Sequence, residues 1–349
     1  MRLTSRERVM AAFEHVEGDR VPAWCGASAE FWAKAKRELA LDDEPLRVRL
    51  GDDFRRVTAR YGGPLAPLSP NATCRTPFGV ERHGMGYGMP LSHPLRNASL
   101  KEVEAYVWPQ PFWLDVSAVR ADAAAYGKQY AILGGEWSPF WHDAIDLFGM
   151  DALMVTMYED PDIVDTVMKR VVDYYVESSK RIFDEAADEI DIFFIGNDLG
   201  SQHGPLLGEG LFRRFILPHI ARLVDLGHSY GLKIMMHCCG GVAEFVPALI
   251  EIGLDALHAV QPSCRGMNLA TLKHQFGAKI VFNGAIDSHH VLIKGTPGLV
   301  RQKTREVLDI MKPGGGYIAG ASHDAILEET PVENVLAMFD AVREFGVYG

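Results

Sequence analysis

The sequence predicts an α/β fold, a single (β/α)8 TIM barrel, from three observations. Short apolar segments occur along the chain and each is followed by a helix-like stretch, which is typical of parallel strands buried on both faces. The chain has 349 residues and 48% hydrophobic composition, enough for the roughly 250 residues of such a barrel. No G-x-G-x-x-G follows the first strand and no G-x-x-x-x-G-K-S/T occurs, which disfavours an open nucleotide-binding sheet.

The elements follow in order from the N-terminus, where an amphipathic helix is predicted over residues 6–16 with Thr4 or Ser5 as N-cap. The predicted strands cover 21–26, 130–135, 190–198, 233–240, 256–262, 279–287 and 317–323; with one or two strands before residue 128 the total is close to eight. The predicted helices cover 142–157, 160–187, 209–229, 241–253, 267–276, 296–312 and 332–345. Pro218 should kink or split its helix, and Pro331 suits the first turn of the last one.

Residues 61–100 interrupt this pattern. The segment is dense in Gly and Pro and has no sustained period, so it is predicted as a long excursion with one hairpin. Ordered loops of this length in compact enzymes are often lids, and a dimer arm is the other interpretation. The whole chain, residues 1–349, is therefore predicted as one barrel domain with this insertion.

Composition and charge exclude several classes of protein. The chain carries 35 Lys and Arg against 46 Asp and Glu, a formal net charge of −11, which does not indicate a nucleic-acid-binding surface. The longest apolar runs fall short of the roughly 20 residues that span a bilayer, and the charged N-terminus does not resemble a signal peptide. Five cysteines, two of them adjacent, do not form a disulfide framework. We expect an acidic, cytoplasmic enzyme that binds neither nucleic acid nor membrane.

Reactive side chains gather where the predicted strands end. They are Glu136, Asn197, Asp198, His237, Cys239, Gln261, Asp287 and His323. In a (β/α)8 barrel the carboxyl ends of the strands together form the floor of the active site. Loops begin with polar residues in any protein, but here His, Cys, Asp and Glu recur in place of Ser and Gly, which favours a catalytic face.

His237 and Cys239 form the sharpest pair at these strand ends. Side chains alternate along a strand, so these two point the same way, about 7 Å apart, and Cys238 points to the other face. An imidazole and a thiol placed in this way suit zinc. An H-x-C pair alone is a weak signal, because buried free cysteines are common and a histidine at a strand end often only caps a carbonyl.

Spacing alone leaves the third metal ligand open. The candidates from other strand ends are His323, Asp198, Glu136 and Asp287, with Cys264 as a weaker one. Each would have to reach the H-x-C pair from a different strand, which the barrel arrangement allows.

Other residues near the strand ends carry weaker signals. His142 and His203 start helices and are candidates for acid–base chemistry, while the adjacent His289 and His290 are interpreted as surface residues. Cys25 is interpreted as a small buried hydrophobe. Three tryptophans near the mouth hint at an aromatic or apolar substrate, although core packing explains them about as well: Trp24, Trp137 and Trp141.

Four segments together resemble one enzyme family. They read TSRERVMAAFEHVEGDRVP, HCCGGVAEFVPALIEIGLDALHAVQP, FGAKIVFNGAID and GGGYIAGASHDAILEETPVENVLAMFDAV. This combination is similar to the uroporphyrinogen decarboxylase superfamily, which includes the decarboxylases and zinc-dependent, corrinoid-linked methyltransferases. The resemblance covers nearly the whole chain and implies a (β/α)8 barrel, in agreement with the strand pattern.

The N-terminal segment separates the two branches of this family. Uroporphyrinogen decarboxylases carry an R-Q-A-G-R-Y motif there, which grips substrate carboxylates, but in this chain no arginine lies between Val21 and Lys36. Arg82 and Arg96 in the excursion are the substitutes that the chain offers. The methyltransferase branch is therefore the closer resemblance.

In the methyltransferase branch the zinc is held by H-x-C and a later cysteine. His237 and Cys239 match the first two ligands, and Ser322-His323 stand near the third, so the resemblance implies zinc on His237, Cys239 and His323. It further implies methyl transfer between a corrinoid on a partner protein and a small thiol, methoxy or methylamine-type substrate. The family and the excursion also make a homodimer plausible.

This reaction assigns roles to the remaining strand-end residues. The predicted catalytic residues are Asp198, Glu136 and His323. The predicted substrate-binding residues are Asn197, Gln261, Asp287 and Trp137.

Two other functions stay open. A metal-independent decarboxylase acting on a tetrapyrrole or other carboxylated substrate would use Asp198 to stabilise a protonated ring and His323 to assist proton transfer. A non-catalytic barrel that binds a tetrapyrrole or corrinoid would need none of these reactive residues. A chelator separates the first two enzymes, because only the methyltransferase would lose activity.

Overall fold

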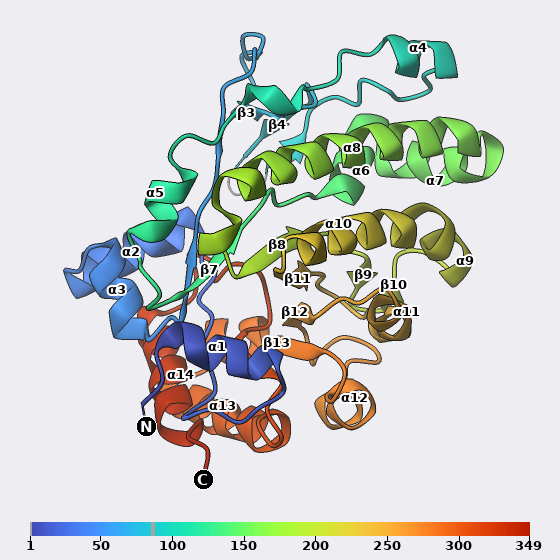
Figure 1. Cartoon of the computed structure of the whole chain (residues 1–349). Helices are drawn as coiled ribbons and strands as arrows, with labels where there is room; N and C mark the ends of the chain where they lie inside the picture. The colour runs from blue at the N-terminus through green and yellow to red at the C-terminus, as the bar shows by residue number, and fades with distance from the viewer. Residues whose placement is uncertain (1, 85–87) are drawn as a thin grey trace.

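One curled parallel sheet organises the chain (Figure 1), and the computed structural model describes residues 2–84 and 88–349. Its strands in spatial order are β1 (Phe54–Arg56), β7 (Ala131–Gly134), β8 (Ile192–Gly196), β11 (Lys233–His237), β12 (Ala256–Val260), β13 (Val281–Ile286) and β14 (Tyr317–Ala321). All neighbours in this sheet are parallel. The predicted α/β class and the six strands predicted after residue 128 are confirmed, with somewhat shorter limits.

The segment predicted as a strand at 21–26 lies against both edges of this sheet. The Trp24 amide donates to the carbonyl of Ala319 in β14 at 2.9 Å. The carbonyl of Ala23 accepts from the amide of Asp53, directly before β1, at 3.0 Å. The extended segment therefore bonds to the last and the first strand of the curled sheet.

Apolar side chains fill the inside of the curled sheet. Leu133, Phe194 and Met235 from three successive strands belong to one buried cluster. Phe13 of α1 (Ser5–Phe13) joins this cluster, and α1 begins with a capping box at Thr4. The inner face is thus a packed core, as barrel interiors are, and leaves chemistry to the strand ends.

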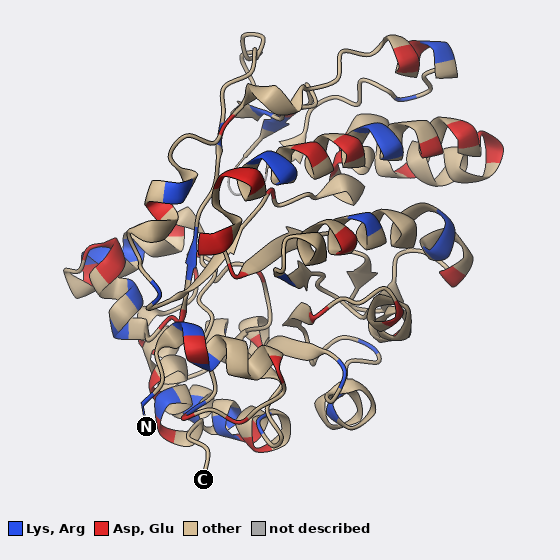
Figure 2. Cartoon of the chain, in the orientation of Figure 1, with Lys and Arg blue, Asp and Glu red and all other residues tan. Residues whose placement is uncertain are grey.

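Helices cover the outer face of the sheet. They are α6 (Phe140–Phe148), α7 (Met150–Glu159), α8 (Pro161–Ala186), α9 (Glu209–Leu211), α10 (Leu217–Ser229), α11 (Val246–Glu251), α12 (Leu269–Phe276), α13 (Pro297–Met311) and α14 (Val332–Phe345). Figure 2 shows positions of basic and acidic residues mixed along the α8 ribbon, whereas few charged positions fall on the strands. Within the described residues, the helices are too short or too polar to traverse a bilayer.

Two predicted helices are interrupted, and each interruption has a local cause. The predicted helix at 142–157 is divided at Gly149, whose positive φ of 81° is a backbone conformation that strains other residues. The predicted helix at 209–229 contains a π-helical turn immediately before Pro218, as expected from a proline that removes a backbone donor.

Among the described residues, four α-helices and one strand of the parallel sheet were not predicted from the sequence. The helices are α2 (Ala29–Leu39), α3 (Asp43–Leu50), α4 (Leu100–Ala105) and α5 (Val119–Ala124). Strand β1 was missed because two of its three residues are arginines. Arg55 is nonetheless buried, since its guanidinium lies 3.7 Å from the ring centroid of Tyr130 and pairs with Glu44 at 2.6 Å.

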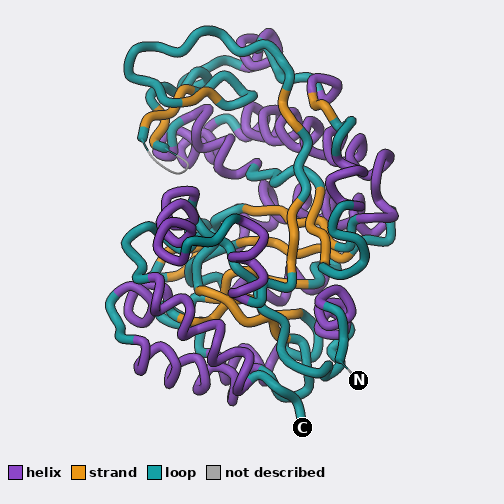
Figure 3. The backbone as a smooth tube through the Cα atoms, turned by 90° about the vertical axis from the view of Figure 1, so that its left-hand side faces the viewer, coloured by secondary structure: helices purple, strands orange, loops and turns teal. Residues whose placement is uncertain are grey.

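The excursion at 61–100 contains short antiparallel strands. β2 (Arg60–Tyr61) pairs with β6 (Leu114–Asp115), and β3 (Cys74–Arg75), β4 (Glu81–His83) and β5 (Met89–Pro90) form a three-stranded meander in place of the single predicted hairpin. Figures 1 and 3 show this meander beside α8, at the end of the molecule far from both termini.

Two ion pairs fasten the excursion to the helices below it. Arg82 of β4 binds Asp146 of α6 with its Nε 2.7 Å from Oδ2, and both side chains are largely buried. Arg96 binds Asp151 of α7 at 2.8 Å in a more exposed position. The excursion is therefore tied to the α6–α7 layer that flanks the strand ends.

Candidate functional site

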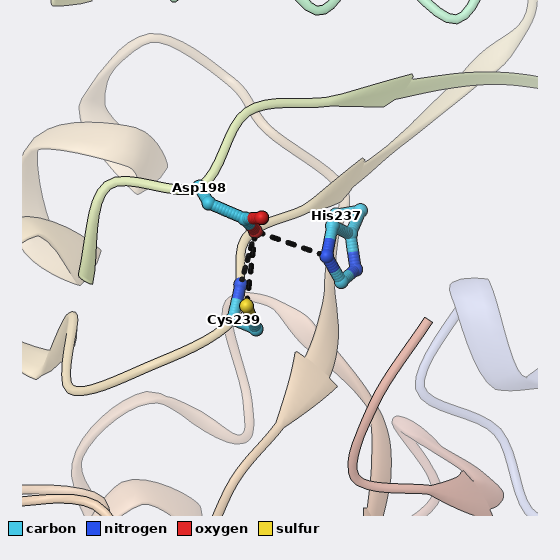
Figure 4. A group of neighbouring side chains, drawn as sticks. All are labelled: Asp198, His237 and Cys239. Atoms are coloured by element: carbon cyan, nitrogen blue, oxygen red, sulfur yellow. Dashed lines mark hydrogen bonds and ion pairs between the residues drawn. The ribbon is translucent and has the colours of Figure 1, made fainter. Parts of the chain in front are cut away.

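Three chemically reactive side chains meet at the carboxyl ends of β8 and β11 (Figure 4). His237 is the last residue of β11, and its Nε2 lies 3.0 Å from Oδ1 of Asp198, two residues beyond β8. The same Oδ1 accepts from the backbone amide of Cys239 at 3.1 Å and from its Sγ at 3.0 Å. The predicted H-x-C pair and the predicted Asp198 are thus brought together.

Backbone close contacts fix the position of Cys239. The following residue, Gly240, has φ 91°, and a Cβ there would lie 2.4 Å from the carbonyl carbon of Gly200. Its amide donates to Oε1 of Gln261 at 2.8 Å. Cys238 points the other way, as predicted, and its buried Sγ accepts from the amide of Leu199.

Charge and burial set the ionisation of this group. Burial alone would raise the pKa of Asp198, but hydrogen bonds with His142 and His237 hold that pKa well below its usual range. Burial would also lower the pKa of His237, and the bond to Asp198 raises it instead. For Cys239, burial and the Asp198 carboxylate both raise the thiol pKa. The thiol therefore stays protonated unless a positive charge comes between it and Asp198.

His142 holds the other oxygen of Asp198. Its Nε2 lies 3.2 Å from Oδ2, so both carboxylate oxygens have imidazole partners. His142 stands near the start of α6, which the preceding loop carries over the strand ends. This contact suits an orienting role for His142 toward Asp198, and the acid–base role expected from the sequence stays a prediction.

A second imidazole behind His237 was missed by the sequence reasoning. Nδ1 of His258, in β12, lies 3.1 Å from Nδ1 of His237, and the His258 side chain is fully buried. Burial, with the nearby His237, lowers the pKa of His258 to about 3. Asp324 offers an oxygen within 4.8 Å of donor atoms of both histidines. The sequence gives no signal for His258, because it lies inside the apolar run ALHAV. Asp324 could have been found, because it directly follows the predicted site residue His323.

His323 lies beside the group and not in it. Its Nδ1 is 3.0 Å from the carbonyl of Ala325, so this nitrogen faces its own loop. Within the part of the chain that the structure describes, the residue sets whose donor atoms lie within 4.8 Å of one another contain Asp198, His237 and Cys239, or His237, His258 and Asp324, and not His323. His323 instead lines the cavities described below.

Glu136 and Trp137 follow β7; Trp137 flanks the group, whereas the amide of Glu136 donates to the hydroxyl of Ser179 in α8. The Trp137 ring stacks on His237 with centroids 5.7 Å apart, which is possible because Gly196 beneath it has no side chain. The guanidinium of Arg56 lies 5.3 Å from the Trp137 ring centroid. Burial raises the pKa of Glu136 to about 7, against a smaller opposite effect of Arg56. Glu136 can therefore exchange a proton near neutral pH.

Three other predicted substrate-binding residues have structural partners. Asn197 is fully buried, and its amide accepts from the Trp141 backbone and donates to Ser138 O. Gln261 accepts from Gly240 as described above. Asp287 caps the turn after β13 by accepting from the His290 amide at 2.6 Å. These contacts suit positioning roles, and Gln261 and Asp287 also line a cavity.

A cavity of about 420 Å³ opens on the reactive group. It is lined by Thr76, Pro77, Arg82, Gly88, Trp137, Pro139, His142, Asp143, Ile145, Asp146, Tyr175, Asp198, His237, His323 and Asp324. We call it the inner cavity. Residues of the excursion thus form one wall and the strand ends form another.

Two further cavities adjoin His323. One of about 480 Å³ contains Gln261, Cys264 and Asp287, with the exposed His289 and His290 at its edge. The other, of about 630 Å³, contains Trp24, Cys25 and Arg56. Trp141 is fully buried, which fits core packing, and His203 is exposed on the hairpin after β8.

The donor set fits a zinc ion. A thiol, an imidazole and a carboxylate are all zinc ligands, and their donor atoms lie within 4.8 Å of one another. Asp198 Oδ1 already approaches both other donors at 3.0 Å, so small side-chain rotations would open a shared position. A cation there would also offset the raised thiol pKa of Cys239.

A curled parallel sheet with an imidazole, a thiol and a carboxylate gathered at its carboxyl end defines an α/β enzyme with a candidate metal centre. The chain belongs to the uroporphyrinogen decarboxylase (URO-D) family, whose model matches residues 90–345. The family predicted from the sequence motifs is confirmed.

The relatives indicate which branch of the family is closer. The methylcobamide:CoM methyltransferase MtbA of Methanosarcina mazei is 23% identical over 98% of both chains. The protein of the same name from Methanosarcina acetivorans is 22% identical over 66% of this chain and 63% of its own length. A solved methyltransferase from Methanosarcina mazei has a TM-score of 0.71 at 19% identity over 99% of both chains, which shows a shared fold. The predicted methyltransferase branch is confirmed. The uroporphyrinogen decarboxylase of Ralstonia pickettii is 23% identical over 54% of this chain and 49% of its own length.

Proposed function

We propose that this chain transfers a methyl group between a corrinoid on a partner protein and a small thiol, methoxy or methylamine-type substrate, with a zinc ion on Asp198, His237 and Cys239. The observation that carries the proposal is the convergence of these three zinc-type donors from two neighbouring strand ends. The relatives named as methylcobamide:CoM methyltransferases support the class of reaction.

The chain's own residues arrange the reaction. When bound, zinc supplies the positive charge that lets a thiol lose its proton or a heteroatom leave. Asp198 holds its carboxylate between His237 and Cys239 while His142 fixes its second oxygen. Trp137 stacks on the ring of His237 and gives the inner cavity an apolar wall.

The strand-end residues outside the metal group act on the substrate in this proposal. His323 lines all three cavities, and in this proposal it contacts the substrate there. The third metal ligand is therefore Asp198 instead of His323. Glu136, with its raised pKa, holds or releases a proton at its carboxyl. Gln261 and Asp287 line the adjoining cavity, and Asn197 positions the approach to α6.

The excursion is proposed to act as a lid over the inner cavity. Thr76, Pro77 and Arg82 line the cavity opposite the metal group. We infer in addition that the segment at 21–26 is the eighth strand of a closed barrel, which its bonds to β14 and to Asp53 support. A cytoplasmic location and a homodimer complete the proposal.

The decarboxylase alternative receives no support from the arginines that it requires. Arg82 and Arg96, the substitutes for an N-terminal carboxylate clamp, are ion-paired with Asp146 and Asp151. Binding of a substrate carboxylate would have to break those pairs. A porphyrinogen with several carboxylates is therefore a poor match to this site.

Metal content and methyl transfer test the proposal together. The wild type, purified without chelators, should contain about one zinc per chain by inductively coupled plasma mass spectrometry. It should demethylate methylcobalamin in the presence of a small thiol, followed by the change in corrinoid absorbance. A double variant, His237→Ala with Cys239→Ala, should lose both properties. Zinc-free wild type, or full activity in the double variant, would contradict the proposal.

A further inference from the structure

Two histidines face each other at the centre of the site. His237 and His258 are register partners on the adjacent strands β11 and β12. Their Nδ1 atoms are 3.1 Å apart, and their side chains are 4% and 0% exposed. Because both rings are buried, water cannot readily take the place of either partner in this contact.

The protonation of the two rings is linked by this contact. Two facing ring nitrogens make a hydrogen bond when one carries the proton and the other is bare. A histidine that binds a metal through Nε2 must carry its proton on Nδ1, and it usually donates that proton to a carboxylate, a carbonyl or water. Here Nε2 of His237 faces Asp198 and Nδ1 faces an imidazole.

We propose that His258 is a positioning residue: its Nδ1 accepts the proton of His237 Nδ1–H and so presents the bare Nε2 of His237 to the metal. This inference rests on the proposed zinc centre. His258 then carries its own proton on Nε2, which has no hydrogen-bond partner among the described residues.

Packing holds the His258 ring in the required orientation. The rings of Trp24 and Phe194 lie edge-on to it, with centroids 5.3 and 5.4 Å away. Both neighbours are themselves buried in the inner core. Nδ1 of His258 is therefore held in position as an acceptor. The conformational entropy of the His258 side chain is lost when the protein folds and not when the metal binds.

Variants at His258 distinguish its role as a hydrogen-bond acceptor for His237 from a role in packing alone. His258→Leu removes the acceptor and keeps an apolar side chain of moderate size. His258→Asn removes the ring but keeps an oxygen close to the position of Nδ1. Trp24→Phe disturbs the packing around the ring and leaves the acceptor in place, so it is the matched control.

Zinc affinity, measured by competition with a chromogenic chelator, is the first readout. His258→Leu should lose about 10- to 100-fold in affinity, the usual effect of removing an outer partner of a ligand. His258→Asn should recover most of the loss, and Trp24→Phe should stay near the wild type. Thermal unfolding of the zinc-free forms checks that each variant is folded.

Two results would overturn the inference. One is unchanged zinc affinity in His258→Leu. The other is an equal loss in all three variants, which would assign His258 to packing. A wild type without zinc would instead defeat the proposed function. In that case ¹⁵N imidazole shifts of the zinc-free protein still test the contact, although Nε2 of His237 then carries a proton toward Asp198: a bare Nδ1 on His258 supports the inference, and a proton on Nδ1 of His258 contradicts it.

Discussion

Asp198 is the residue on which the site depends most. One carboxylate accepts from the amide and the thiol of Cys239 and contacts the imidazoles of His237 and His142. Removal of its charge takes away the anion around which these donors are arranged. The sequence marks it only as one of several acids at strand ends, and the structure distinguishes it by these contacts.

The substitution Asp198→Asn should therefore abolish tight zinc binding. The amide lacks the negative charge of a ligand and turns a donor toward one imidazole, so the loss should exceed the roughly 10- to 100-fold expected for an outer partner. Competition with a chelator measures it. Asp287→Asn is the matched control, because Asp287 also follows a strand but caps a turn outside the metal group, and an asparagine caps equally well. If both variants bind zinc with equal affinity, Asp198 is not a ligand of the metal.

The buried Asp143 predicts a pH dependence of stability. Burial raises its pKa to about 7, although the Tyr175 hydroxyl donates to it at 2.6 Å. The folded state therefore binds a proton that the unfolded state releases near its ordinary value of 3.8. The contribution of Asp143 to the free energy of unfolding therefore falls as the pH rises from about 4 to about 7, and it is lowest above pH 7.

Asp143→Asn should remove this contribution. The free energy of unfolding of the variant, relative to the wild type, should rise as the pH is increased from about 4 to 8. Urea unfolding at a series of pH values measures the difference, which cancels the titration of all unchanged groups. A difference that is constant with pH would show that Asp143 titrates alike in both states.

Some residues of the site could be predicted from the sequence and others could not. His237 and Cys239 were predictable because two-residue spacing at a strand end puts both on one face. His258 and His142 come close only through strand register and the path of the loop before α6. His142 was predicted only as an acid–base candidate and His258 was not predicted, because neither contact has a local signal in the sequence.

At the scale of elements, one device recurs at the amino ends of the strands. An aspartate directly before a strand accepts the amide of a residue in the adjacent strand or extended segment. Asp53 accepts from Ala23, Asp191 from Ile132 and Asp255 from Ile234, at 2.8 to 3.0 Å. Each also pairs with a basic side chain. These contacts lie at the end of the sheet opposite the reactive residues, where we expect them to stabilise the fold.

The three aspartates should differ in their effect on stability according to burial. Their side chains are 1%, 5% and 20% exposed for Asp53, Asp191 and Asp255. Asp53→Ala removes a buried carboxylate that pairs with both Arg8 and Arg20, and although Arg8 keeps Asp19 as a partner, the change should cost about 3–5 kcal/mol. Asp255→Ala should cost about 1 kcal/mol, with Asp191→Ala between them. Urea unfolding gives the order, and equal costs would contradict it.

The strands were the most predictable elements of the fold. Apolar runs such as IDIFFIGND and KIMMHCCG mark strands buried on both faces, and the structure ends them a few residues earlier because the chain turns at the reactive residues. Strand β1 was not predicted because it contains two arginines, which hydropathy assigns to the surface. Arg55 is buried only because it stacks on Tyr130 and pairs with Glu44. Gly149 divides a predicted helix because it adopts a positive φ of 81°, a conformation that the apolar pattern does not reveal.

At the scale of the whole molecule, two ion pairs of different exposure join the excursion to the helices α6 and α7. The Arg82–Asp146 pair is 16% and 9% exposed, whereas the Arg96–Asp151 pair is 41% and 73% exposed. Exposed pairs contribute little, and a partly buried pair leaves an uncompensated charge when one partner is removed. The first pair should therefore control how often the proposed lid opens.

Arg82→Gln should make the excursion easier to cleave. Asp146 would lose its partner, and residues 61–100 should open locally while the sheet stays folded. Cleavage by a protease at limiting amounts should be faster by about tenfold, which corresponds to about 1.4 kcal/mol of local opening. Arg96→Gln, which removes the exposed pair, should be cleaved at the wild-type rate. If both variants are cleaved alike, the buried pair does not hold the excursion over the inner cavity, and the proposed lid loses its fastening.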